Sequence, residues 1–217
     1  MNNKLLKRIL STIILMPFII FIIIKGSFYF SFLLIICVFI SIFEWHKMTK
    51  KNWYSYFGIL FLLFSFYTIY KIRNSFDSEY FHLLLITLVC IATDVGGFLF
   101  GKLIKGPKIT KISPNKTYAG MVGSFLLPII LFYVLSENIY IKYSYNLNSK
   151  IIIFIILVSA VSQIGDLIIS YFKRISKVKD TGKIIPGHGG LLDRIDGMIF
   201  AFPFSYLIMT TNNINIL

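Results

Sequence analysis

The chain has 217 residues, of which 57% are hydrophobic and only 14% are charged, and its formal net charge is +13. A soluble domain of this size could not bury so much apolar surface, and a disordered protein would be far more polar. The composition therefore excludes both classes and leaves an integral membrane protein, provided that the apolar residues form runs long enough to span a bilayer.

Seven apolar runs follow one another along the chain. They cover residues 9–24, 28–43, 54–70, 83–100, 118–135, 151–172 and 191–209. Each run has roughly the 20 residues that a helix needs to cross the hydrocarbon layer, and continuous apolar runs favour helices over a barrel. The sequence predicts an all-α polytopic membrane protein with about seven transmembrane helices, in which residues 1–217 form a single transmembrane domain.

The positive charges alternate between the connections of these runs. With the N-terminus in the cytoplasm, the cytoplasmic segments contain 17 of the 22 Lys and Arg residues. Cytoplasmic loops are enriched in Lys and Arg, so this distribution predicts a cytoplasmic N-terminus and a C-terminus on the outer side.

Two acidic residues, Asp94 and Asp166, lie well inside long apolar runs. Asp94 lies in the fourth run and Asp166 in the sixth, at a similar distance from the predicted cytoplasmic end of each helix. An ionisable residue within a span is costly, so its default interpretation is functional. The two aspartates therefore predict one shared polar site near the cytoplasmic surface. Glu44, beside Trp45 at the end of the second run, is interpreted as part of a membrane-edge anchor.

The connection at residues 101–117 is basic and contains no acid. It ends in Ser113, Lys116 and Thr117 just before the next helix, and small hydroxyls, a lysine and a helix N-terminus together favour an anion. A solvated basic loop that attracts anionic lipid headgroups is an equally good interpretation of this segment alone.

The string at residues 170–196 is much more specific. Its glycines, including Gly189 and Gly190, give the backbone the freedom to direct amides at phosphate oxygens. Four cations can neutralise phosphate charge, and they are Lys173, Arg174, Lys179 and Arg194. Asp193 and Asp196 share a helix face if the last helix begins near residue 191, and carboxylates beside such a loop suit a divalent metal that holds phosphates.

This string resembles the signature of the phosphatidate cytidylyltransferase (CDP-diacylglycerol synthase) family. The matching features are the serine, the Lys-Arg and Lys-Asp pairs, Pro-x-His-Gly-Gly and Asp-Arg-x-Asp within residues 170–196. Contributing segments near 94–120 and 163–166 are similar to the family as well, although Ala119 stands where its members usually have a glutamate.

The resemblance implies that CTP and phosphatidate react to give CDP-diacylglycerol and pyrophosphate for phospholipid synthesis, at a site that faces the cytoplasm in the cell membrane. It implies Mg²⁺ held by Asp166 and Asp193, with Asp196 as a further ligand or close neighbour, a second cation such as K⁺, and a homodimer. The catalytic group that it implies is Lys173, Arg174, Lys179, Asp180, His188 and Arg194. The implied substrate-binding group is Asp94, Ser113, Lys116, Thr117, Gly189 and Gly190.

Two other functions stay open. A CTP-dependent lipid-alcohol kinase of related architecture would have to activate a hydroxyl, and the complete signature argues against it. An ion-coupled transporter would use Asp94 and Asp166 to carry ions, but the sequence has no internal repeat of the kind that transporters usually show.

Overall fold

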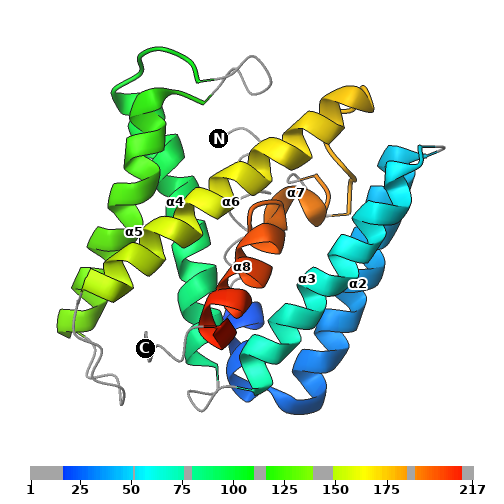
Figure 1. Ribbon diagram of the computed structural model, residues 1–217, viewed down its shortest axis with the longest axis horizontal. Coiled ribbons are helices and arrows are strands. Elements are labelled where there is room, and N and C mark those ends of the chain that lie inside the picture. Colours follow the sequence, from blue (N-terminus) through cyan, green and yellow to red (C-terminus); the bar gives the residue numbers. More distant parts are fainter. Residues whose placement is uncertain are drawn as a thin grey trace, which may run out of the picture.

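The computed structural model describes residues 17–50, 52–75, 80–109, 116–138, 149–184 and 189–211, and helices dominate them. A helical segment at residues 17–25 precedes the labelled helices. These are α2 (Ser27–Thr49), α3 (Tyr54–Asn74), α4 (Phe81–Leu103), α5 (Tyr118–Asn138), α6 (Ser149–Ile175), α7 (Leu192–Ile195) and α8 (Met198–Thr211). The prediction of an all-α fold is confirmed for this part of the chain (Figure 1).

Five of these helices, α2 to α6, are long and apolar enough to cross a membrane. They coincide with five of the seven predicted runs, and each extends a few residues beyond its run because polar residues at a helix end continue the same backbone. The chain is therefore a multi-pass membrane protein. The first predicted run is described only from residue 17 onward, and its earlier part lies outside the described residues.

The last apolar run does not form one continuous helix from residue 191, as the sequence analysis expected. It is divided into the four-residue α7 and the 14-residue α8, with Asp196 and Gly197 between them. The Gly197 amide donates to the Asp196 carboxylate (3.0 Å). Such a local bond competes with the helical ladder. Asp193 lies in the single turn of α7 and Asp196 is the residue that ends it, so the two keep the expected three-residue spacing, but the helix that carries them stops at the break.

The helices pack as two pairs joined by α6 and α8. α4 lies along α5 and α2 along α3, while α6 contacts both α4 and α5 and α8 packs between α6 and α3 (Figure 1). Glycines allow the close approach of α4 and α5, because a Cβ on Gly96 would collide with the Gly123 carbonyl oxygen. This tight contact fixes the height of α4, and therefore of Asp94, relative to α5.

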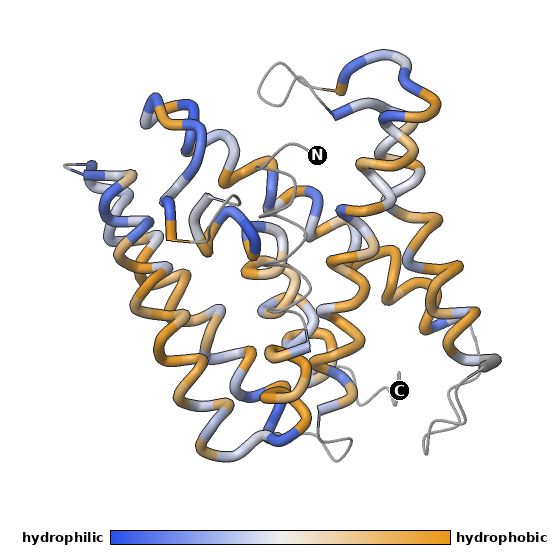
Figure 2. Tube along the Cα trace, turned by 180° about the vertical axis from the view of Figure 1, so that it is seen from behind, coloured by the Kyte–Doolittle hydropathy of each residue, from blue (hydrophilic) through white to orange (hydrophobic). Residues whose placement is uncertain are grey.

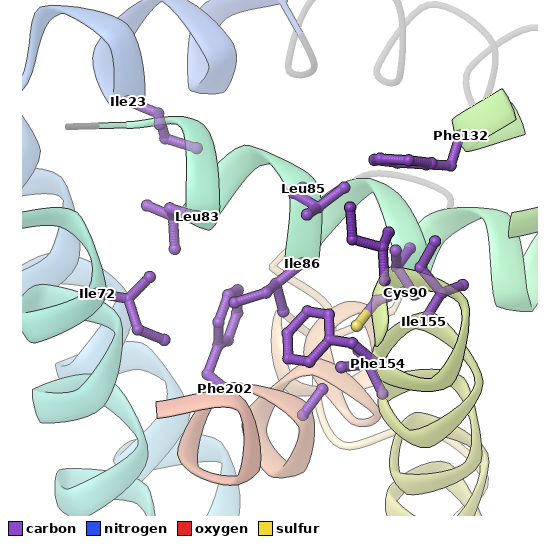
Figure 3. Close-up of a cluster of buried hydrophobic side chains, with 14 of the residues drawn as sticks. Ile23, Ile72, Leu83, Leu85, Ile86, Cys90, Phe132, Phe154, Ile155 and Phe202 are labelled. Carbon is purple, nitrogen blue, oxygen red and sulfur yellow. The ribbon is translucent and has the colours of Figure 1, made fainter. Parts of the chain in front are cut away.

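A core of buried apolar side chains holds α4, α6 and α8 together. Ile86 from α4, Phe154 from α6 and Phe202 from α8 meet in its centre, and each is at most 5% exposed (Figure 3). A second apolar cluster surrounds Trp45, Leu62 and Leu192 and joins α2 and α3 to α7. α7 is therefore seated against α2 by packing as well as by the polar contacts described below.

Hydrophilic residues gather at one end of the bundle, as Figure 2 shows. This end carries the connections from α2 to α3, from α4 to α5 and from α6 to α7 (Figure 1). These are three of the segments that the positive-charge pattern assigned to the cytoplasm. Away from this end the helices are predominantly apolar over most of their length, as expected for segments that lie in a membrane.

Candidate functional site

The two aspartates within apolar helices lie the same number of residues before the polar ends of those helices. Asp94 in α4 and Asp166 in α6 are each nine residues before the last residue of their helix, Leu103 and Ile175. At a rise of 1.5 Å per residue this corresponds to about 14 Å along each helix. Asp94 is exposed although its neighbours Ala92 and Thr93 are buried, and its carboxylate interacts with Asp166, Lys116 and Arg194.

Three carboxylates converge where α4, α6 and the break before α8 meet. Asp94 and Asp166 interact electrostatically, and both also act on Asp196, which is only 8% exposed. Burial, followed by the repulsion from Asp166, raises the pKa of Asp196 well above its usual range against the opposing effect of Lys173. The site therefore concentrates negative charge that a cation would stabilise.

Two lysines already counter part of this charge. Lys116, from the basic connection before α5, forms an ion pair with Asp166. Ser170, one turn further along α6, donates to the same carboxylate at 3.2 Å. Lys173 is buried and lies 3.0 Å from Asp193 and 3.8 Å from Asp196. The basic connection and the signature string thus reach the same cluster from opposite sides.

Asp193 holds the signature loop together. One of its oxygens accepts from Lys173 at 3.0 Å, and the other accepts from the backbone amides of Thr181 (2.8 Å) and Gly190 (3.0 Å). Burial opposes ionisation, but the Gly190 amide and Lys173 outweigh it and lower the pKa of Asp193. Asp193 is thus an ionised carboxylate with most of its acceptor positions filled. The loop after α6 folds back over the end of that helix to make these contacts.

The other predicted site residues lie around this loop or outside the described residues. Arg174, Lys179, Asp180 and Arg194 are exposed at the polar end. Gly189 has φ +89°, a conformation that glycine adopts readily, and it lies against Asp180 and Asp193. Thr117 accepts from the Gly120 amide at 3.1 Å, which caps the start of α5. Ser113 and His188 fall outside the described part of the chain.

The interpretation of Glu44 as a membrane-edge anchor is wrong. Its side chain is buried, with 1% exposure, and it accepts three hydrogen bonds from the segment at residues 181–192. The apolar run ended at residue 43 in the sequence, whereas α2 continues to Thr49 and places Glu44 inside the helix. Glu44 would have been predicted as a functional residue, like Asp94 and Asp166, if the helix had been extended to residue 49. Because the apolar run ends at residue 43, Glu44 falls outside the predicted span.

The site offers hard oxygen ligands in the form that Mg²⁺ prefers. Within the described residues, no three His, Cys, Asp or Glu side chains are arranged to hold a metal ion as they stand. Asp166 and Asp196 nevertheless repel each other electrostatically, and each has a lysine as a salt-bridge partner, Lys116 for Asp166 and Lys173 for Asp196. Asp166 and Asp196 each have one ion-pair and one hydrogen-bond partner here, whereas Asp193 accepts from three donors, so the chemistry of the first two carboxylates is the better suited to a divalent ion.

Comparison with known families gives one matching profile. It is the one described as the Cytidylyltransferase family, and it covers residues 6–79 and, in an overlapping second match, residues 62–212. These two matches together include every helix of the structure and all of the carboxylates discussed above.

Individual relatives agree with this match. A Rickettsia bellii protein named phosphatidate cytidylyltransferase is 33% identical over 215 residues, which cover 95% of this chain and 91% of the relative. Proteins of the same name from Staphylococcus saprophyticus and Staphylococcus aureus are 38% and 34% identical over 173 and 178 residues. In both cases the match covers 76% of this chain and 64% of the relative, so the chain spans less than two thirds of these staphylococcal proteins.

Proposed function

The chain belongs to the cytidylyltransferase family, and from this premise we propose that it transfers the cytidylyl group of CTP to phosphatidate. The products would be CDP-diacylglycerol and pyrophosphate. The observation that carries the proposal is the convergence of Asp94, Asp166 and Asp196 with Lys116 and Lys173 at the polar end of a membrane-embedded bundle. Such a site can receive a water-soluble nucleotide and a lipid at the same place.

The chemistry requires positioning more than proton transfer. An oxygen of the phosphatidate phosphate attacks the α-phosphorus of CTP, a new P–O bond forms, and the bond from the α-phosphorus to the bridging oxygen breaks to release pyrophosphate. The attacking oxygen is already anionic near neutral pH, so a strong base is unnecessary. The main barrier is the approach of two polyanions and the charge on the leaving pyrophosphate, which preorganised cations lower.

The basic residues of this chain would supply that electrostatic stabilisation. Arg174, Lys179 and Arg194 are exposed at the polar end and would bind phosphate oxygens. Lys116 and Lys173 would exchange part of their contact with carboxylates for contact with substrate phosphates. Asp166 and Asp196 would hold Mg²⁺, with Asp193 beside them, and a second cation such as K⁺ could share the cluster. Bound Mg²⁺ would neutralise phosphate charge and stabilise the departing pyrophosphate.

A labelled-nucleotide assay tests the function directly. The purified chain in detergent with phosphatidate should incorporate ³²P into lipid from [α-³²P]CTP and none from [γ-³²P]CTP. A lipid-alcohol kinase would give the opposite pattern with diacylglycerol as acceptor, because it transfers the γ-phosphoryl group. Lipid labelled from the γ-position, or no labelled lipid with either nucleotide, would exclude cytidylyl transfer.

We further propose that the polar end faces the cytoplasm. Lys108 and Lys183 are exposed at this end, whereas Asn74 is exposed at the opposite end of α3. A membrane-impermeant maleimide should therefore label Lys108→Cys and Lys183→Cys in inverted membrane vesicles but not in intact cells, and Asn74→Cys should behave in the reverse way. The native Cys37 and Cys90 lie within helices α2 and α4, away from either surface. Labelling of position 183 in intact cells would show that the polar end faces the outer side, and the proposed orientation would be wrong.

A further inference from the structure

Glu44 connects the second helix to the signature loop, although the two are far apart in the sequence. Its Oε1 accepts from the Leu191 amide at 3.0 Å, and its Oε2 accepts from the Leu192 amide at 2.9 Å and from the Thr181 hydroxyl at 3.0 Å. Leu191 and Leu192 are the residues at which α7 begins. A buried carboxylate that accepts from three donors holds the backbone that carries them in one place, because removing it would leave those donors unsatisfied.

Glu44 and Asp193 divide the donors of the loop between them. The amide of Gly190 donates to Asp193, and the next two amides, of Leu191 and Leu192, donate to Glu44. Thr181 joins both carboxylates, because its amide donates to Asp193 while its hydroxyl donates to Glu44. Any shift of the Glu44 carboxylate would therefore move the backbone that presents Asp193.

The space around Glu44 leaves little room for adjustment. A Cβ on Gly182 or Gly190 would collide with the Glu44 carboxylate, so the loop backbone lies directly against it on both sides. Glu44 itself is held by its helix, because the adjacent Trp45 packs edge-on against Phe172 of α6 with ring centroids 5.1 Å apart. Phe172 precedes Lys173, the lysine that contacts Asp193 and Asp196.

We propose that Glu44 is a positioning residue for the transfer reaction, setting the placement of Asp193, and through it of Lys173, at the start of α7. This inference rests on the proposed cytidylyl transfer for its kinetic consequence, while its structural consequence can be measured independently. Glu44 lies outside the signature string and acts on it from α2, through direct hydrogen bonds. It never contacts a phosphate in this role; it holds the loop that does.

The substitution Glu44→Gln separates this role from simple space filling. Glutamine has the same size, but one carboxylate oxygen is replaced by an amide nitrogen, which donates and cannot accept. At least one of the three donors around position 44 would therefore face this nitrogen without forming a hydrogen bond. Hydrogen–deuterium exchange of the peptide containing residues 190–193 should accelerate at least tenfold, with the α6 peptides unchanged. The kcat for cytidylyl transfer should fall roughly 10–100-fold, as for groups that orient a catalytic ligand, with a smaller change in the KM for CTP.

Ser65→Ala is the matched control. Ser65 is also buried on an early helix, and its hydroxyl donates to the Ile199 carbonyl of α8 at 2.7 Å rather than to the described part of the loop. It should lower the midpoint of thermal unfolding in detergent with kcat per folded molecule unchanged. If Glu44→Gln behaves in the same way, with parental kcat per folded molecule, the positioning role is wrong.

Thr181 gives a second test if Glu44→Gln fails to fold. Thr181→Val keeps the amide bond to Asp193 and removes the hydroxyl bond to Glu44, whereas Thr181→Ser keeps both. The valine variant should have a lower kcat and faster exchange at residues 190–193, as Glu44→Gln does. The serine variant should match the parent in both measurements. Parental kcat in Thr181→Val would overturn the proposal. If the parent chain transfers no cytidylyl group, the proposed function fails, and unchanged exchange at residues 190–193 would separately reject the loop-positioning role.

Discussion

Asp166→Asn should abolish nearly all cytidylyl transfer while the protein still inserts and folds. The asparagine keeps the size of the side chain and can still accept from Ser170, but it removes the negative charge that pairs with Lys116 and that the proposed Mg²⁺ would need. Groups that merely orient a metal ligand contribute about 10–100-fold, so loss of a ligand itself should reduce kcat/KM by at least about 100-fold. Transfer from [α-³²P]CTP over a range of Mg²⁺ concentrations measures this, and excess Mg²⁺ should rescue the variant only partially.

Ser170→Ala is the control for this substitution. It removes the hydroxyl that donates to Asp166 and leaves the carboxylate and its charge in place. The expected loss is smaller than for Asp166→Asn, because a hydrogen bond to a charged group contributes about 1.5–3 kcal/mol and this 3.2 Å bond to a partly exposed carboxylate lies at the weak end of that range. Comparable losses in Ser170→Ala and Asp166→Asn would indicate that Asp166 acts through hydrogen bonding, and parental activity of Asp166→Asn at low Mg²⁺ would remove it from the metal site altogether.

The spans that the sequence predicts correctly are those that form one long helix with an apolar window. α2 to α6 each contain a window of high hydropathy with few charges, which is the physical requirement for lying in hydrocarbon. The last run is also apolar for most of its length, but it is divided at Asp196 and Gly197, where a local side-chain bond competes with the helix. Hydropathy averages over such a break and cannot detect it.

The signature string identified the region of the site but not the partners of its residues. Lys173 was expected to bind phosphate, and in the structure it is buried between Asp193 and Asp196. Glu44 escaped prediction because it contacts residues 137 to 148 positions away. Spacing along one helix or loop indicates which residues share a face, whereas contacts between distant segments depend on how the helices pack.

Lys173→Met should have the second large effect, and it should act on stability as well as activity. Lys173 is the cation nearest to two carboxylates that are themselves mostly buried, with 5% and 12% of their side chains exposed. Removing one partner of a buried ion pair leaves an uncompensated charge and costs about 3–5 kcal/mol. The midpoint of thermal unfolding in detergent should fall markedly, and transfer activity should be lost.

A double variant shows whether the cost comes from the stranded charge. In Lys173→Met with Asp193→Asn, the asparagine oxygen can still accept from the Thr181 and Gly190 amides, while no buried charge at position 193 lacks its counter-ion. This variant should be inactive but more stable than Lys173→Met alone. The difference in stability between Lys173→Met and the parent should also become smaller as the pH falls through the pKa of Asp193. Lys173 helps to lower that pKa, so it stabilises the fold only while Asp193 is ionised, and a protonated Asp193 gains nothing from the lysine. Equal unfolding midpoints for the single and double variants would mean that Lys173 stabilises the loop through packing, and its pairing with Asp193 would then contribute little to holding the signature in place.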